Sequence, residues 1–211
     1  DGDSIIVGGP DSLSFGIRFG AAFVYSRAGS TWTQQQKLTA SDGAASDYFG
    51  GSVGISADTV VVGAPKTTQG ANTIQGAAYV YVRSGVAWSE QAKLIASDGA
   101  TGDFMGGSAA ISGSTIVVGA PYGGASAQGA AYAYVRSGTV WSEQAKLTAS
   151  GGGIASGYLG NSVAVAGTTA VVGAPNDAPS GGIRTGGGYV FSVGEPLPIV
   201  FVPGIAGSVL V

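Results

Sequence analysis

A unit of roughly 54 residues recurs four times along this chain of 211 residues. Each unit holds a β-branched segment that ends in Gly-Gly-Pro in the first copy and Gly-Ala-Pro in the other three. The prolines of these segments, at positions 10, 65, 121 and 175, are 55, 56 and 54 residues apart. A fixed period of this length is typical of repeat folds, in which each unit buries its apolar surface against its neighbours. The repeat therefore limits the possible folds more than any other feature.

Three further motifs recur in register with the proline motif. The first is a large apolar residue followed by Gly and, two residues later, Ser. The second is Gly-Ala-Ala-Tyr-Val-Tyr or a near copy, and the third is Trp-x4-Lys-Leu. In chain order, the first motif begins at Phe49, Met105 and Leu159, the second at Gly20, Gly76, Gly129 and Gly187, and the third at Trp32, Trp88 and Trp141.

Each unit predicts four short antiparallel strands. In the second unit they fall at 52–56, 59–62, 78–83 and 87–96, and the first two are joined by Ala57-Asp58, a connection short enough for a hairpin. Tyr79 and Tyr81 alternate with Val80 and Val82, as expected of a strand with two packed faces. The 39 glycines suit short strands and tight turns better than helices. We expect an all-β fold, a β-propeller of four-stranded antiparallel blades, either a closed four-bladed ring or part of a larger propeller.

The domain boundaries follow from the repeat. We expect a propeller over residues 1–195, with blade units at about 1–47, 48–102, 103–156 and 157–195, and a C-terminal segment at 196–211. Residues 204–211 align with the Gly-Gly-Ser-Val strand of the other units, and could complete the first blade and close the ring. Alternatively, residues 198–208 resemble the first core strand and oxyanion loop of α/β-hydrolase lipases and acyltransferases. That resemblance implies an accessory N-terminal propeller of a secreted lipase or esterase.

Composition excludes several functions. The net charge is −3 and the basic residues are scattered singly, so nucleic acid is not an expected partner. No apolar run is long enough to span a bilayer as a helix. The chain has no Cys and no His, so the Gly-x-Ser-x-Gly pattern at 50–54 lacks the base that a nucleophilic serine needs. We expect Ser52, Ser108 and Ser162 to form hydrogen bonds within their blades, and we expect no enzymatic activity from this chain.

The order Phe-Gly, Gly-Ala-Pro, Tyr-Val-Tyr, Trp-x4-Lys-Leu resembles the bacterial FG-GAP repeat, which is related to the blades of integrin α subunits. The resemblance covers roughly residues 1–192. It implies an extracellular or cell-surface propeller that acts in adhesion or ligand binding, often with calcium in Asp-rich hairpin loops. Here the corresponding hairpins, 56–58, 112–114 and 166–168, hold too few oxygen ligands for calcium, and we expect no cofactor.

Acidic residues recur between units with the spacing Asp-Gly-x3-Asp. The pairs are Asp42 with Asp47 and Asp98 with Asp103, whereas the third copy has Gly151 and Gly157 at these places. They are the weak candidates for a cation site. Hydrogen bonds that stabilise turns are the interpretation we favour.

The loops after Gly-Ala-Pro differ between units, and loops carry binding where a scaffold repeats. We therefore expect a protein or glycan to bind at 66–73, 122–127 and 176–184, which should lie on one face. The candidate residues are Lys66, Thr67, Gln69, Tyr122, Asn176, Asp177 and Arg184. The three tryptophans could stack on sugars, but we favour packing between blades. A third hypothesis is self-association through the open edges of an incomplete propeller.

Overall fold

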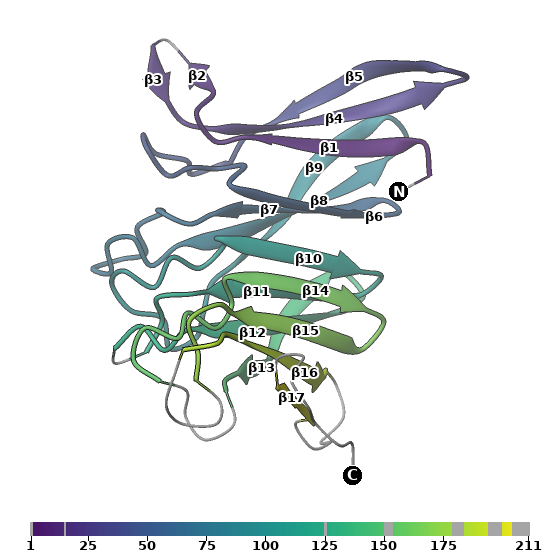
Figure 1. Ribbon diagram of the computed structural model, residues 1–211. Coiled ribbons are helices and arrows are strands. Elements are labelled where there is room, and N and C mark those ends of the chain that lie inside the picture. The colour runs from purple at the N-terminus through teal and green to yellow at the C-terminus, as the bar shows by residue number, and fades with distance from the viewer. Residues whose placement is uncertain are drawn as a thin grey trace.

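The computed structural model describes residues 2–14, 16–124, 126–149, 154–178, 184–193 and 200–203. In these residues the chain forms four antiparallel sheets of three or four strands, one for each repeat, and we call them the first to fourth blades (Figure 1). The predicted all-β fold of propeller blades is confirmed. The predicted strand positions are also confirmed, to within two residues at each end.

Each blade runs outward in chain order. The second blade holds β6 (Ser52–Ser56), β7 (Thr59–Ala64), β8 (Ala77–Ser84) and β9 (Ala87–Leu94). The third holds β10 (Ser108–Ser112), β11 (Thr115–Ala120), β12 (Ala130–Ser137) and β13 (Val140–Leu147). The fourth holds β14 (Ser162–Ala166), β15 (Thr169–Ala174), β16 (Gly187–Ser192) and β17 (Val200–Pro203).

The first blade is incomplete on its inner side. It holds β1 (Ser4–Gly9), β4 (Ala21–Ala28) and β5 (Thr31–Leu38), in the order β1-β4-β5. A small hairpin of β2 (Leu13–Ser14) and β3 (Ile17–Arg18) lies in the connection. By sequence and pairing β1 corresponds to β7, so among the described residues no strand occupies the place of β6.

The four blades are stacked in a row, with the first and fourth blades at opposite ends (Figure 1). Of the two expected arrangements, the closed four-bladed ring is therefore wrong, and the chain forms an open section of a propeller. Residues 204–211, expected to close the ring, lie outside the described residues. β17, from the segment of the hydrolase resemblance, pairs with β16 as the outer strand of the fourth blade.

The core consists of three layers, one between each pair of blades. Residues such as Ala22, Val24 and Leu38 of the first blade pack on Val60, Val62, Tyr79, Tyr81 and Trp88 of the second. The same kind of packing recurs in the next two layers. Val61 of the second blade packs with residues of the third blade, and Val117 of the third blade packs with residues of the fourth. β7 and β11 are buried on both faces, because each lies between two of these layers.

The recurrent serines connect neighbouring blades. The Ser52 hydroxyl donates to the carbonyl of Gly106 at 2.8 Å, and Ser108 donates to Gly160 at 2.8 Å. Our expectation of hydrogen bonds within a blade is wrong for these two residues, because the inner strands lie so close that each hydroxyl reaches the next backbone.

Candidate functional site

A pocket of about 300 Å³ opens between the loops that follow β5 and β7, where the first two blades meet. It is lined by two sequence candidates from each loop, Asp42 and Asp47 from the first and Lys66 and Thr67 from the second. The structure thus joins residues that the sequence placed in two separate hypotheses, one for a cation and one for a ligand. A second pocket, of about 320 Å³, lies beside it and is lined by Lys37, Thr39 and Ala40 among others.

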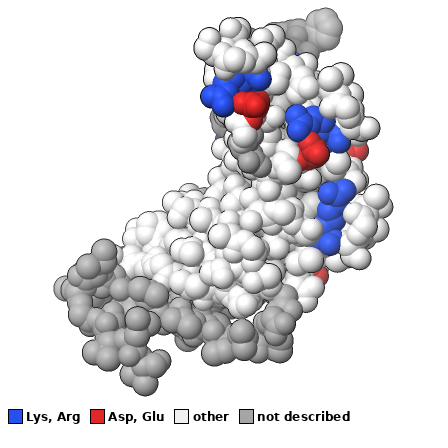
Figure 2. Space-filling model, turned by 90° about the vertical axis from the view of Figure 1, so that its right-hand side faces the viewer, with Lys and Arg blue, Asp and Glu red and all other residues white. Residues whose placement is uncertain are grey.

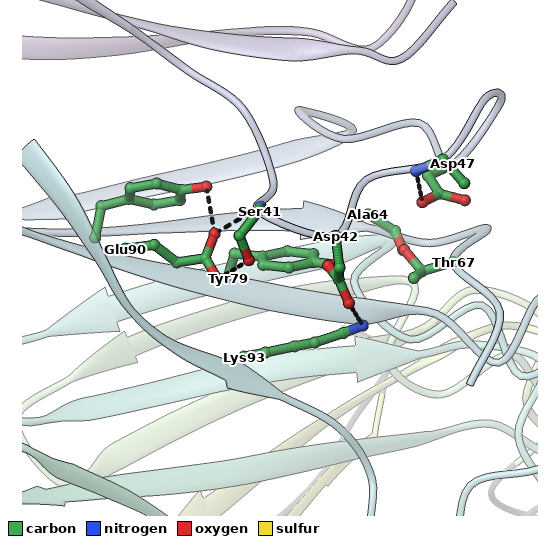
Figure 3. Close-up of polar contacts among 10 residues, drawn as sticks. Ser41, Asp42, Asp47, Ala64, Thr67, Tyr79, Glu90 and Lys93 are labelled. Atoms are coloured by element: carbon green, nitrogen blue, oxygen red, sulfur yellow. Dashed lines mark hydrogen bonds and ion pairs between the residues drawn. The ribbon is translucent and has the colours of Figure 1, made fainter. Parts of the chain in front are cut away.

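Asp42 links the two blades. Its Oδ1 accepts a hydrogen bond from the Tyr79 hydroxyl at 2.7 Å, and its Oδ2 pairs with the Lys93 ammonium at 2.6 Å (Figure 3). Partial burial by itself would raise the pKa of Asp42, but the bonds from Lys93 and Tyr79 outweigh it and hold that pKa below its usual value. Burial and the adjacent carboxylate together raise the pKa of Tyr79 far above its ordinary range.

Asp47 has a different role, within its own turn. It is buried, and its carboxylate accepts the Ala44 amide at 2.8 Å (Figure 3). Burial raises the pKa of Asp47, although the bond from Ala44 opposes the shift. This is the turn-stabilising hydrogen bond that we favoured from the sequence.

The same geometry recurs between the second and third blades. Asp98 accepts from Tyr132 at 2.8 Å and from Lys146 at 2.6 Å, and Asp103 accepts the Ala100 amide at 2.7 Å. The bond from Lys146 lowers the pKa of Asp98 despite partial burial. A cation at Asp42 or Asp98 would have to displace a lysine, and the described residues include no group of three or more possible metal ligands. In the structure the four aspartates make hydrogen bonds that recur from one repeat to the next.

A second polar link accompanies each aspartate. Glu90 accepts hydrogen bonds from the backbone amide and the hydroxyl of Ser41 at 2.9 and 2.8 Å (Figure 3). Glu143 binds Ser97 in the same way. We did not predict this contact from the sequence. The sequence does contain a pattern that could have predicted it, because Ser-Asp and Trp-Ser-Glu recur together in consecutive units.

Two of the candidate ligand residues are internal. Thr67 is buried and its hydroxyl donates to the Ala64 carbonyl at 2.8 Å. Asp177 is also buried; its carboxylate accepts the Tyr189 hydroxyl and the Ala178 amide. If these two residues contribute to binding, they do so by stabilising the conformation of their loops.

Gln69 carries an unusual buried group. Among the described side chains, its Nε2 is the buried polar atom that has no hydrogen-bond partner. The backbone of Gln69 exchanges two hydrogen bonds with Asn72, which closes the tip of the 66–73 loop. A buried donor without a partner is costly, and a buried water is the usual partner of such a group.

In the second and third blades, the residue after Gly-Ala-Pro lies beside an aromatic ring. The Lys66 ammonium is 3.8 Å from the centre of the Tyr48 ring. Tyr122 lies between Phe104 and Tyr158, and its ring centre is 5.0 Å from that of Phe104 and 5.2 Å from that of Tyr158. Tyr122 is 47% exposed.

The aromatic partners have a strained backbone. Tyr48, Phe104 and Tyr158 have φ values of 59°, 56° and 58°, which bulky residues rarely adopt. The following residue in each case forms a parallel bridge to the preceding blade, and this bridge fixes the turn. The strain thus places one aromatic ring from each of these blades on the loop face.

The remaining candidates lie near the fourth blade. Asn176 is partly buried, and its backbone N–H donates to the Gly157 carbonyl. Arg184 is exposed and its guanidinium donates to the Ala155 carbonyl at 3.0 Å. The structure therefore does not bring these two residues into the pocket of Asp42 and Lys66.

The tryptophans divide into two classes. Trp88 and Trp141 are buried, and their Nε1 groups donate to Gln35 and Gln91 of the preceding blades, which confirms packing between blades. Trp32 of the first blade is 39% exposed.

The face opposite the loops shows little charge patterning. Figure 2 shows basic side chains there in separate groups, some beside acidic ones, with uncharged surface between them. Ion pairs join Arg27 to Asp3 and Arg83 to Asp58. Within the described residues, no helix is long and apolar enough to cross a membrane.

Comparison with known proteins identifies the repeat. Residues 32–81, 88–134 and 141–191 each match the model of the FG-GAP repeat, and together they make up more than half of the chain. The crystal structure of TolB from Acinetobacter baumannii is similar at 14% sequence identity and a TM-score of 0.46. That match covers 95% of this chain and 44% of the TolB chain. No curated protein matches the sequence.

Proposed function

Because the chain belongs to the FG-GAP repeat family, we propose that it is an extracellular binding module. It recognises a protein or a glycan through the loop face, as part of adhesion at a cell surface. The stacked blades serve as a rigid scaffold, and the ligand contacts the loops that follow the Gly-Ala-Pro strands.

The observation that carries this proposal is the pocket of Asp42 and Lys66, at the edge of a repeated scaffold. The polar links around it recur in the next pair of blades, but the residue after the proline is Lys66 in one blade, Tyr122 in the next and Asn176 in the last. Variation at a loop position of a repeated unit suits recognition better than stability.

The chemistry of this face suits mixed polar and aromatic contacts. Lys66 supplies a cationic hydrogen-bond donor at the pocket. The exposed ring of Tyr122 supplies an apolar surface on which a sugar ring or a peptide side chain can pack. We propose no catalytic role, since the chain contains neither His nor Cys.

The test is a screen of the purified chain on arrays of glycans and of extracellular proteins. Alanine at Lys66 or at Tyr122 should weaken binding of any ligand found by about tenfold or more, equivalent to about 1.4 kcal/mol. The matched control is Val86→Ala, at an exposed residue in the hairpin between β8 and β9, outside both pockets. Blank arrays, or binding that neither loop variant changes, would reject the proposal.

A further inference from the structure

The two ends of the stack expose surfaces that are covered everywhere inside it. In each internal layer, the forward face of one blade, which is directed toward the next blade in the chain, packs on the rear face of that next blade. Among the described residues, no further blade covers the forward face of the fourth blade or the rear face of the first blade (Figure 1).

The forward face of the fourth blade keeps the residue types of a covered face. Val171 is 45% exposed, whereas Val61 and Val117 at the same position are both 0% exposed. Ala164 of the inner strand is exposed, and its counterpart Gly54 lies against Ile111 of the next blade. A valine on a strand with such neighbours gains its burial only if another blade covers it.

A glycine position shows the same difference in the backbone. A Cβ at Gly8, Gly63 or Gly119 would overlap the carbonyl oxygen of Gly50, Gly106 or Gly160 in the following blade. At Gly173, the fourth copy, the nearest described atoms belong to Ser162 of its own blade. The fourth blade thus carries the glycine that permits the backbone of a next blade to approach closely. Among the described residues, no such backbone lies beside Gly173.

The rear face of the first blade is the matching surface. Ile5, Val7 and Trp32 are 37%, 47% and 39% exposed, whereas Val60, Val62 and Trp88 at the same positions are almost completely buried. Lys37 is exposed at the position of Lys93, the residue that pairs with an aspartate of the preceding blade.

We infer that the forward face of the fourth blade binds the rear face of the first blade of a second copy of this chain. The three internal layers of the chain indicate the occupant, because forward faces of this kind pack only on rear faces of this kind within it. The contact is head-to-tail, so each copy uses two different surfaces. Two copies would bring together eight blades, the upper end of the usual range for propellers.

The contact is weaker than an internal layer. The first blade has no described strand at the place of β6, so a second copy offers β1, β4 and β5 rather than a complete four-stranded rear face. Association should therefore be reversible and depend on concentration. It uses the ends of the stack and does not involve the pocket on the loop face.

The test combines variants of the two faces. The mass of the wild-type chain in solution, measured by light scattering after size exclusion, should rise with concentration above the 20.5 kDa of one chain. Val171→Asp and Val7→Asp each place a charge on one exposed face, and each variant alone should remain a single chain. An equimolar mixture of the two should form a complex of two chains, because one intact forward face and one intact rear face remain.

The controls separate this result from damage to the fold. Val140→Asp changes an exposed valine at the start of β13 and should associate as the wild type does. Ala164→Lys gives a second forward-face variant at an exposed position, and all variants should keep the wild-type thermal transition at low concentration. A wild-type chain that stays at the mass of one chain, a Val171→Asp variant that still self-associates, or a mixture that forms no complex would overturn the inference.

Discussion

Asp42 illustrates how single residues hold neighbouring blades together. It belongs to the loop after the first blade, yet both of its carboxylate oxygens are bound by residues of the second blade, Tyr79 and Lys93. Its distance of 37 residues from Tyr79 in the chain makes this a long-range contact. Since Asp98 repeats the arrangement, the contact is a property of the repeat.

Replacing Asp42 with Asn should lower the free energy of unfolding by about 1 kcal/mol, because Lys93 loses its counter-ion while Tyr79 keeps a possible acceptor. The matched control is Asp11→Asn, which breaks the pair with Arg18, where both side chains are 62% exposed. That control should change stability by less than about 0.5 kcal/mol. Urea unfolding of the three proteins checks the prediction, and equal losses from both substitutions would contradict it.

The stabilisation by Asp42 should also depend on pH in a defined direction. Its pKa in the folded chain lies below the ordinary value of 3.8, so the unfolded chain takes up the proton first as the pH falls. The contribution is complete well above pH 3.8 and is lost as the pH falls through the lowered pKa. Unfolding curves of the wild type and Asp42→Asn should therefore converge in acid, and a stability difference that persists below the folded pKa would contradict the assignment.

At the scale of elements, the inner strands determine how closely the blades approach. β6, β10 and β14 lie beside one another, with a glycine of β7 or β11 against the backbone of the following blade. The larger side chains, Tyr79 and Trp88, lie on β8 and β9, where the blades are wider apart. Small residues inside and rings outside give each blade the wedge shape of a propeller.

Alanine at Gly63 or Gly119 should therefore destabilise the chain by about 3 kcal/mol, because the new methyl group meets a backbone carbonyl that can move only if the next blade shifts. Alanine at Gly173 is the matched control in the same motif. It meets a serine side chain that can rotate, so it should cost less than about 1 kcal/mol. Thermal or denaturant unfolding of the three variants gives the comparison, and a loss at Gly173 as large as at Gly63 would refute this account.

At the scale of the whole molecule, stability should decrease toward the ends of the stack. A repeat array is held by contacts between nearest neighbours, and the end blades have one neighbour each. β7 and β11 are buried along their whole length, whereas Val7 of β1 and Val171 of β15 are exposed.

Amide hydrogen exchange should follow this order in a dilute sample of single chains. Amides of β7 and β11 should be the most protected, and those of β1 and β15 should exchange faster, because local opening of an end blade breaks one interface instead of two. Mass spectrometry of peptic fragments resolves these strands. Uniform protection from β1 to β15 would show that the stack opens as one unit.

Much of the fold was predictable because its information is local and repeated. The hairpin at Ala57-Asp58, the alternation around Tyr79 and the proline that ends each second strand are short-range patterns, and repetition confirmed each of them several times. The candidate site was only partly predictable. Lys66 and Asp42 were identified in different motifs, but their shared pocket depends on how two blades meet. Thr67 and Asp177 have the residue types of a surface loop, and only the packing shows that they are buried.

The sequence by itself determined the repeat, its four strands per unit and its family, because these depend on residue order within about fifty positions. Only the tertiary structure decided that the blades form an open stack, that Asp42 and Asp98 connect blades, and that Ser52 and Ser108 bond to the next backbone. The physical reason is that each of these features depends on the relative placement of separate sheets. That placement is fixed by the packing of glycines, valines and aromatic rings across an interface, and no single unit contains both of its sides.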